Sequence, residues 1–515
     1  MRSVYQPQAN NKLLHVLRTM LATGVAYAVN YGITLLLTPY ITRTVGTEAY
    51  GFVTLAKQFS QYAAILTTAL NTYAARYIGL CYHQNDTKQA NVYFSSVFFG
   101  DLALACLILG LTAVALPFLQ RVLSIPGAIV TDVKMLFLFT GVSFWVTTVC
   151  SVFGCAGYIQ DRMDLTGLFK TLSYVTNALV LLIAYLLFPA RVCYVGLGAL
   201  AAALIVAVSD GWLSRRLLPQ LTPRRRDFSI AAVRRLVVDG FWQSFNLVGD
   251  LLNNGLDLLV CNQLLTSLAM GQLAIAKTMH TIIHSLYTVV DQAFIPRFLQ
   301  RYAAGDREGL LDELKISMKA SGLLANVTFA GFVALGPAYY RLWIPGQDID
   351  LIYRLTVVTI LTCIPNGAVH PLYYIYTLTV KKKIPCYVTV AGGIVNVIGM
   401  YVLIRYAGMG VYAVAWTTVA VMAVINFVTN PLYMAHVLQL PPATFYPDIL
   451  RNVLACGALT AAFQLLAALY TPGSWAGLIA CAAAYALIGA PLHLLIACNK
   501  KQRNRLMGLL KKKTA

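Results

Sequence analysis

Two lysines occupy equivalent places in apolar stretches of the two halves of the chain. Lys57 ends the stretch Gly-Phe-Val-Thr-Leu-Ala-Lys, and Lys277 ends the stretch Gly-Gln-Leu-Ala-Ile-Ala-Lys, with the same spacing from the glycine. The offset that aligns these stretches also aligns Asp86 with Asp306. An ammonium group is costly to hold in hydrocarbon, so each lysine is expected to face protein or water. The pattern predicts an internal repeat with a polar site at its interface.

Further polar residues lie three or four positions apart around these lysines, which places them on common helix faces. The candidates for substrate binding are Lys57, Lys277, Gln61, Asn71, Asn30, Asn253 and Asn254. The candidates for coupling or charge tuning are Asp250, Asp257, His280, His284 and Asp291. These residues form polar stripes on four apolar segments, residues 13–42, 49–78, 237–265 and 268–295. Because lipid cannot solvate polar stripes, these four segments are expected to face one another across a hydrated cavity.

The role of Asp257 stays open at this point. It either neutralises one of the two lysines in a buried ion pair or tunes the charge of a cationic cavity. The helical rise of about 1.5 Å per residue places Lys57, Lys277 and Asp257 at a similar depth in their spans. In both cases one of the two lysines has no obvious acidic partner at that depth. A cationic cavity open to water suits an anionic head group such as a pyrophosphate.

The histidines allow two interpretations. His280 and His284 are one helical turn apart, so they could relay protons with Asp291 or act simply as hydrogen-bonding residues. No carboxylate lies between them in the pattern of zinc peptidases, so no metal is expected. Three other histidines stand alone in the sequence and indicate no site: His370, His436 and His493.

The composition is that of a protein embedded in a membrane. Hydrophobic residues make up 59% and charged residues 11% of the 515, and the mean hydropathy is +0.68. Lysine and arginine number 39 against 19 acidic residues. In a soluble chain such an excess would suggest nucleic acid, but here the basic residues gather in a few loops and tails. The excess therefore indicates the positive-inside bias of a polytopic membrane protein and no nucleic-acid partner.

Apolar runs of roughly 20 residues predict an all-α polytopic membrane protein with fourteen transmembrane helices. The predicted spans are residues 13–42, 49–78, 93–116, 133–158, 168–188, 192–213, 237–265, 268–295, 321–344, 352–379, 387–406, 411–437, 449–470 and 475–498. Lysine and arginine concentrate in every second loop, which places both termini in the cytoplasm.

The internal repeat sets the expected domains. They are an N-terminal six-helix bundle in residues 1–213, a basic cytoplasmic linker in 214–235, a C-terminal six-helix bundle in 236–438, two additional transmembrane helices in 439–498 and a basic cytoplasmic tail in 499–515. Membrane lipids are expected partners of the basic segments.

No catalytic motif is present. The chain has no phosphate-binding glycine loop, no nucleophile elbow and no zinc-ligand spacing, and its outer loops are short. We therefore expect no enzymatic activity, no catalytic residue and no cofactor. Transport would be driven by an ion gradient, the membrane potential or consumption of the substrate.

Residues 39–51 read Pro-Tyr-Ile-Thr-Arg-Thr-Val-Gly-Thr-Glu-Ala-Tyr-Gly, and residues 74–78 read Ala-Ala-Arg-Tyr-Ile. The first segment resembles the opening of the bacterial polysaccharide-biosynthesis flippases, which carry a threonine-arginine pair, a glycine, an acidic residue and Tyr-Gly before the second span. The second segment resembles the end of that span in the same family. The resemblance is best over the first hundred residues.

That family belongs to the multidrug/oligosaccharidyl-lipid/polysaccharide exporter superfamily. The resemblance implies two pseudo-symmetric six-helix bundles in a V, with spans one, two, seven and eight lining a central cavity. It implies location in the cytoplasmic (inner) membrane and an undecaprenyl-pyrophosphate-linked oligosaccharide repeat unit as substrate. Polysaccharide assembly proteins are then candidate partners. The lipid II flippase branch has an arginine-rich cavity, whereas this sequence offers lysines.

The resulting hypothesis is a flippase for lipid-linked units of an O-antigen, capsule or exopolysaccharide, moved from the cytoplasmic to the outer leaflet by alternating access. The nearest alternative is a cation-coupled multidrug exporter of the same superfamily, which the acidic residues of the seventh span keep open. A membrane oligosaccharide polymerase or ligase is an alternative from another class, and the short outer loops argue against it. A scaffold without transport would leave the polar stripes without a purpose.

Overall fold

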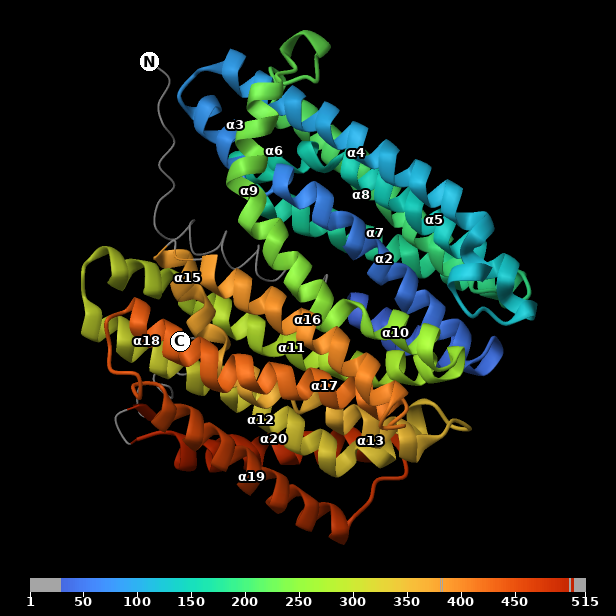
Figure 1. The fold of residues 1–515 in the computed structure, drawn as a ribbon, viewed down its shortest axis with the longest axis vertical. Helices are drawn as coiled ribbons and strands as arrows, with labels where there is room; N and C mark the ends of the chain where they lie inside the picture. Colours follow the sequence, from blue (N-terminus) through green and yellow to red (C-terminus); the bar gives the residue numbers. More distant parts are fainter. Residues whose placement is uncertain (1–28, 380, 382, 500–501, 504–515) are drawn as a thin grey trace. The chain divides into compact units, whose positions relative to one another are not determined.

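The computed structural model describes residues 29–379, 381, 383–499 and 502–503 of the 515. Every regular element in this part of the chain is helical (Figure 1). The predicted all-α class is therefore confirmed. The chain divides into two compact units, Met1–Val248 and Gly249–Ala515, which are described in turn.

Ten of the described helices are long and apolar enough to cross a membrane. They coincide with the predicted spans three to six and nine to fourteen. The predicted spans outside this set are the first, second, seventh and eighth, which are the four that carry polar stripes. Lysine, aspartate and asparagine lower the mean hydropathy of those segments, and the first is described only from residue 29. The count of fourteen and the two six-helix bundles stay predictions.

The first unit is built from antiparallel helices that run from blue to green in Figure 1. Residues 29–44 form its first described helix. The others are α2 Thr47–Asn71, α3 Ala74–His83, α4 Thr87–Val122, η1 Gly127–Ile129, α5 Val130–Val149, η2 Ser151–Gly154, α6 Cys155–Ile159, α7 Met163–Leu187, α8 Cys193–Leu217, η3 Arg225–Asp227 and α9 Ile230–Asp250. Helix α8 packs between α5 and α7, and α4 packs against α3 and α5.

The loops before α4 and before the corresponding helix of the second unit, α12 Arg307–Trp343, share one geometry. Asn85 and Gly305, which the repeat aligns, both adopt the left-handed backbone, with φ of 61° and 69°. The next residue caps the helix in each case: Asp86 Oδ1 accepts from the N–H of Gln89 at 2.9 Å, and Asp306 Oδ1 accepts from that of Gly309 at 2.8 Å. This shared turn supports the internal repeat at the level of the backbone.

The first unit extends past the basic linker into α9. Leu236 is fully buried in one apolar cluster with Ile78 of α3 and Phe94 of α4. Ser244 Oγ donates to the carbonyl of Ile65 on α2 at 2.9 Å. Because these contacts tie α9 to the N-terminal helices, the division between the units falls at Val248, inside the predicted seventh span, and not in the predicted linker.

Gly240 lies where α9 crosses α2. A Cβ atom at this position would collide with the carbonyl oxygen of Ala69, a backbone atom that cannot move aside. We expect Gly240→Val to force the helices apart and to lower the free energy of unfolding by about 1–3 kcal/mol. Gly211→Val on α8 is the matched control, because a Cβ there meets no atom within 4 Å. Thermal unfolding of the purified variants measures both, and equal midpoints would contradict the close crossing.

The regular elements of the second unit are also all helical among its described residues, and the unit runs from green to red in Figure 1. After the end of α9 its elements are η4 Leu251–Gly255, α10 Asp257–Leu264, α11 Ser267–Ala303, α12, α13 Ile349–Ile360, α14 Cys363–Val369, η5 His370–Tyr373, α15 Tyr374–Leu378, α16 Lys383–Arg405, α17 Val411–Val424, η6 Ile425–Thr429, α18 Asn430–Val437, α19 Tyr446–Leu469 and α20 Trp475–Ala497. Helix α12 packs against α11, α13 and α19.

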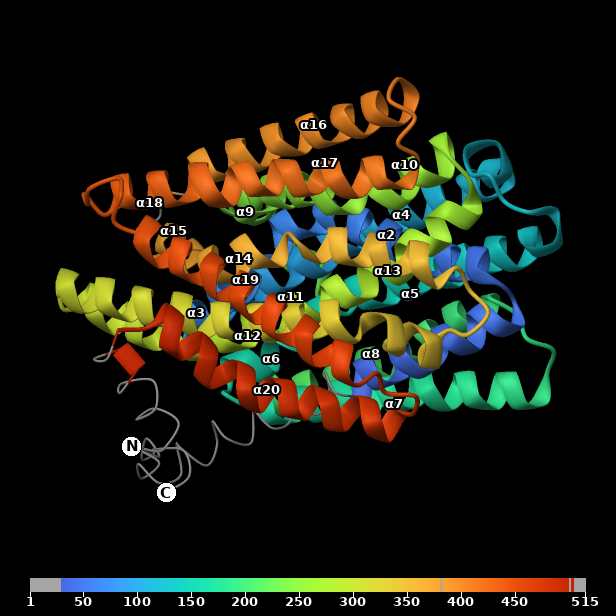
Figure 2. The same ribbon diagram turned by 90° about the horizontal axis from the view of Figure 1, so that it is seen from below.

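The two helices beyond the repeat, α19 and α20, pack along α12 (Figures 1 and 2). Phe463 of α19 and Tyr485 of α20 stack with ring centroids 4.6 Å apart. Lys319 of α12 is fully buried, and its Nζ lies 2.9 Å from Oδ1 of Asp448 at the start of α19. The additional helices therefore belong to the core of the second unit.

Candidate functional site

The predicted seventh span is broken in the second unit. Helix α9 ends at Asp250, η4 is a π-helical turn over Leu251–Gly255, and α10 starts at Asp257. Within the turn the N–H of Leu256 donates to the carbonyl of Leu251, five residues earlier, at 3.1 Å. Such single π turns are frequent at functional sites. The predicted span over residues 237–265 thus contains a π turn at the point where the polar residues Asn253 and Asn254 lie.

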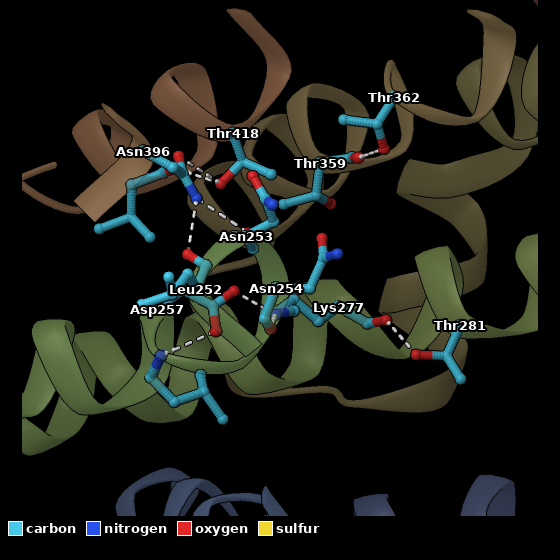
Figure 3. Close-up of polar contacts among 12 residues, drawn as sticks. Leu252, Asn253, Asn254, Asp257, Lys277, Thr281, Thr359, Thr362, Asn396 and Thr418 are labelled. Carbon is cyan, nitrogen blue, oxygen red and sulfur yellow. Dashed lines mark hydrogen bonds and ion pairs between the residues drawn. The ribbon is translucent and has the colours of Figure 1, made fainter. Parts of the chain in front are cut away.

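Asparagines hold the broken segment in place (Figure 3). Asn253 is 1% exposed, and its Nδ2 donates at 2.8 Å both to the carbonyl of Gly249 and to that of Thr389 on α16. Asn396 of α16 donates in turn to the carbonyl of Asn253 at 2.8 Å, and Thr418 of α17 donates to Asn396 Oδ1 at 3.3 Å. The Asn253 amide nitrogen is therefore committed to shaping the break.

Lys277 of α11 forms an ion pair with Asp257, the first residue after the break (Figure 3). Its Nζ also donates to the carbonyl of Asn254 at 2.7 Å. The second carboxylate oxygen of Asp257 accepts from the N–H of Leu258 at 3.0 Å. The side chains of Lys277 and Asp257 are 19% and 6% exposed. Of the two interpretations of Asp257, the structure contains the ion pair, and it joins Asp257 to Lys277.

A small polar hollow of about 20 Å³ adjoins this ion pair. A hollow of that size holds about one water molecule. Its lining residues are Asn254, Asp257, Leu273, Lys277, His280, Thr359, Thr362, Val414, Ala415 and Thr418. The ion pair thus borders a hollow with room for about one water molecule, whose lining includes the three threonines.

His280 and His284 both lie on α11, the helix of Lys277, and His370 of η5 lies next to them. The rings of His280 and His284 are 6.2 Å apart, and the ring of His370 lies 5.7 Å from that of His284. Tyr287 contacts both His284 and His370, at centroid distances of 5.1 and 5.4 Å. No group of acidic, cysteine or histidine side chains among the described residues is arranged to hold a metal. The side chain of Asp291 lies outside the described residues, so the proton relay stays a prediction.

In the first unit, Lys57 is exposed on α2 and makes no hydrogen bond or ion pair with any described residue. Gln61, one turn further along α2, is also exposed. Asn30 is half-buried, and its carbonyl accepts from Thr34 Oγ1 at 3.1 Å. The two repeat-equivalent lysines therefore differ: Lys277 forms an ion pair with a carboxylate, and Lys57 has no partner among the described residues.

Asn71, at the end of α2, has an internal partner. Its Nδ2 donates to both carboxylate oxygens of Asp101 on α4, at 2.8 and 3.0 Å. Ser151 donates to the same carboxylate at 2.7 Å. Asp101 is fully buried and has no basic partner among the described residues. Asp101 stands alone in an apolar run, so residue spacing along the chain offers no signal for it.

The remaining candidates lie around the break. Asp250 is exposed at the last residue of α9, and Asn254 is exposed within the π turn. The structure brings five of the predicted residues of the second unit together at one place: Asn253, Asn254, Asp257, Lys277 and His280.

A sequence profile of the family described as polysaccharide biosynthesis protein matches residues 16–301, which is more than half of the chain. The chain belongs to this family. The resemblance noted over residues 39–51 and 74–78 is thereby confirmed. A curated relative, the uncharacterized membrane protein EpsK of Bacillus subtilis (strain 168), is 26% identical over 491 residues, which cover 95% of this chain and 97% of EpsK.

Solved structures show the same fold as this family member. An inward-facing multidrug resistance MATE transporter of the MOP superfamily matches with a TM-score of 0.67 and 15% identity, covering 82% of this chain and 99% of its own. The lipid II flippase MurJ in an inward closed conformation matches with a TM-score of 0.62 and 13% identity, covering 94% and 99%. The protein is therefore a multi-pass membrane protein with the fold of MOP-superfamily transporters.

A second π turn with polar partners, which was not predicted from the sequence, lies in the second unit of this family member. The π-helical turn η6, Ile425–Thr429, lies inside the predicted twelfth span, which is still one helix of membrane length, Val411–Val437. Tyr373 donates to Asn426 Oδ1 at 2.7 Å, Asn430 donates to Tyr373 at 2.7 Å, and Tyr376 donates to Asn430 Oδ1 at 3.0 Å. Asparagines one turn apart in an apolar run were the available signal. Their tyrosine partners come from another element and could not be paired with them in advance.

Proposed function

We propose that this protein is a flippase that moves polyprenyl-pyrophosphate-linked oligosaccharide repeat units from the cytoplasmic to the outer leaflet by alternating access. The observation that carries the proposal is the pair of lysines at repeat-equivalent positions, of which only Lys277 has a described acidic partner. Membership of the polysaccharide biosynthesis family and the MOP fold support the same function.

Lys57 is the proposed first contact of the head group. A lysine in a membrane-spanning segment is usually paired with a carboxylate or a backbone carbonyl, or faces a water-filled cavity. Lys57 has no such partner among the described residues, and it is exposed within its unit. A pyrophosphate offers the negative charge and the hydrogen-bond acceptors that an unpaired ammonium group lacks. Gln61, Asn30 and Asn254 are proposed as hydrogen-bonding partners of the sugars.

Lys277 is proposed as a head-group contact whose availability depends on Asp257. If a pyrophosphate draws Lys277 away, Asp257 remains buried without its counter-ion, which is energetically costly. A proton or a small cation bound at Asp257 would remove that cost. Substrate binding and cation binding at this ion pair would then favour each other, which is a coupling in the thermodynamic sense. His280, His284 and Asp250 are proposed to tune the charge around it.

A cation-coupled multidrug exporter is the second candidate. The observation in its favour is the TM-score of 0.67 with a MATE transporter. A site for cationic drugs requires an uncompensated acidic residue, and in the second unit Asp257 is already neutralised by Lys277. The buried Asp101 of the first unit is the acid that such a function would use.

Complementation of cells that lack their own flippase tests the proposal. Cells that make a matching sugar unit accumulate the lipid-linked oligosaccharide, and expression of the wild-type protein should lower that pool and restore surface polysaccharide. A polymerase or ligase would instead change the length or attachment of the polysaccharide while the pool stays inside. A well-expressed protein that leaves the pool unchanged but raises resistance to cationic drugs would favour the exporter.

A further inference from the structure

The basic linker of the first unit is firmly attached to α4. Three buried side chains of α4 accept hydrogen bonds from backbone N–H groups of the linker. The pairs are Thr222 N with Asn91 Oδ1 at 2.9 Å, Arg224 N with Ser95 Oγ at 3.0 Å and Ser229 N with Ser96 Oγ at 3.0 Å. Asn91 also donates to Asp227 Oδ2 at 2.5 Å. A segment that served only as a positively charged tether would need none of these buried partners.

Next to this attachment, the linker, α4 and the start of α9 line an open hollow of about 450 Å³. The residues that matter for its chemistry are Gln89 and Tyr93 of α4, Arg226, Phe228 and Ser229 of the linker, and Arg235 of α9. We call it the Arg226–Arg235 hollow. Two guanidinium groups, a hydroxyl, an amide and two aromatic rings thus surround one space.

The charge of this hollow is not balanced from within. Arg226 and Arg235 are exposed, and neither forms an ion pair with a described carboxylate. Asp227 is the acidic residue of the lining, and one of its oxygens is already occupied by Asn91. The hydrogen bond from the Asn91 amide leaves the charge of Asp227 in place, so the two arginines exceed the one carboxylate and the lining carries a net positive charge.

Arg235 is held in position by aromatic side chains. Its Cζ lies 5.0 Å from the ring centroid of Tyr77, and its Nη1 donates to the hydroxyl of Tyr93 at 3.4 Å. Tyr77 is itself fixed by a 2.5 Å hydrogen bond to Asp239. These contacts orient the guanidinium group without neutralising it by a direct ion pair, and such preorganisation lowers the entropic cost of binding an anion.

We propose that the Arg226–Arg235 hollow binds a phosphate group, carried either by the head group of an anionic membrane lipid or by a soluble phosphate ester. Guanidinium groups match phosphate oxygens with paired hydrogen bonds. The predicted topology places the linker at the cytoplasmic membrane surface, where both sources are within reach. The site lies in the linker and is separate from Lys57 and Lys277, so it does not depend on the proposed transport function.

The test compares two double variants of the full-length purified protein. Arg226→Ala/Arg235→Ala removes both arginines of the hollow. Arg225→Ala/Arg234→Ala removes their sequence neighbours, which are equally exposed and do not line it. One probe is inorganic pyrophosphate, with binding measured by calorimetry. The other is phosphatidylglycerol in phosphatidylcholine nanodiscs, with bound lipid counted by native mass spectrometry.

We expect wild type and the Arg225/Arg234 variant to bind at least one probe, and the Arg226/Arg235 variant to bind it at least about tenfold more weakly. If the wild type binds only phosphatidylglycerol, the ligand is a lipid head group. If it binds only pyrophosphate, the ligand is a soluble phosphate ester. Equal losses in both double variants, or no binding of either probe by the wild type, would overturn the proposal. The single variant Arg226→Ala controls for misfolding of the double variant. Arg226 makes no hydrogen bond or ion pair with a described residue, so its loss should not disturb the fold.

Discussion

Replacing Lys277 by methionine, with Asp257 left in place, is expected to lower the free energy of unfolding by about 3 kcal/mol. The carboxylate of Asp257 is 6% exposed and would lose the ion pair that neutralises it. Only the N–H of Leu258, at 3.0 Å, would remain as a described hydrogen-bond donor to it. Transport should fall to background, because the variant removes one of the two proposed head-group contacts.

The matched control is the double variant Lys277→Met/Asp257→Asn. It removes both charges together and should recover most of the lost stability, since no carboxylate is left buried and unpaired. It should not recover transport. Unfolding in mixed detergent micelles measures the stability, and the cellular pool of lipid-linked oligosaccharide measures the transport. A single variant as stable as the wild type would contradict a buried ion pair at this place.

Replacing Lys57 by alanine should lower transport without lowering the stability. Lys57 is exposed and has no described hydrogen-bond or ion-pair partner, so its loss should leave the stability within about 0.5 kcal/mol of the wild type. Transport should nevertheless fall by at least about tenfold, because a charge-assisted contact with the pyrophosphate is lost. Lys57→Arg, which keeps the charge, should retain part of the activity.

Lys88→Ala controls for the loss of a positive charge in the same unit, because Lys88 is exposed in the first turn of α4 and lies outside the candidate site. Each variant is compared at equal amounts in the membrane by quantifying surface polysaccharide. If Lys57→Ala matches Lys88→Ala in activity, Lys57 is not a head-group contact.

Much of the fold could be predicted from the lengths of the apolar runs in the sequence. The ten helices from Thr87–Val122 to Trp475–Ala497 reach membrane length and coincide with predicted spans, because a continuous apolar run satisfies its backbone only as a helix. The aligned pair Asp86 and Asp306 also behaves as the repeat predicts, since an aspartate after a left-handed residue caps the next helix in both places.

The breaks could not be predicted in the same way. Asn253 stands in a run that reads as one helix, and what stabilises the π turn is the carbonyl of Thr389 together with the Asn396 amide, both from α16. Likewise His370 meets His284 across elements, and Asn91 meets Asp227 across many intervening residues. Sequence spacing reports neighbours on one helix face, whereas these contacts depend on which helices pack together.

The ion pair of Lys277 with Asp257 could be predicted from the sequence only in part. The sequence placed Asp257 and two lysines at similar depth and left open which lysine, if either, it would neutralise. The break after Asp250 decides this, because it starts α10 at Asp257 and brings the carboxylate to Lys277 of α11. The asymmetry between the two lysines also has a basis in the sequence, because the offset that aligns them places Leu37 at the position equivalent to Asp257.

Translocation by the purified protein tests the central claim most directly. The protein is reconstituted into liposomes that contain a polyprenyl-pyrophosphate-linked oligosaccharide with a fluorescent sugar, and an impermeant quencher reports how much of the label faces outward. We predict that vesicles with the wild-type protein exchange the label between leaflets at least about tenfold faster than vesicles with Lys57→Ala. Equal rates for wild-type, Lys57→Ala and protein-free vesicles would contradict the account.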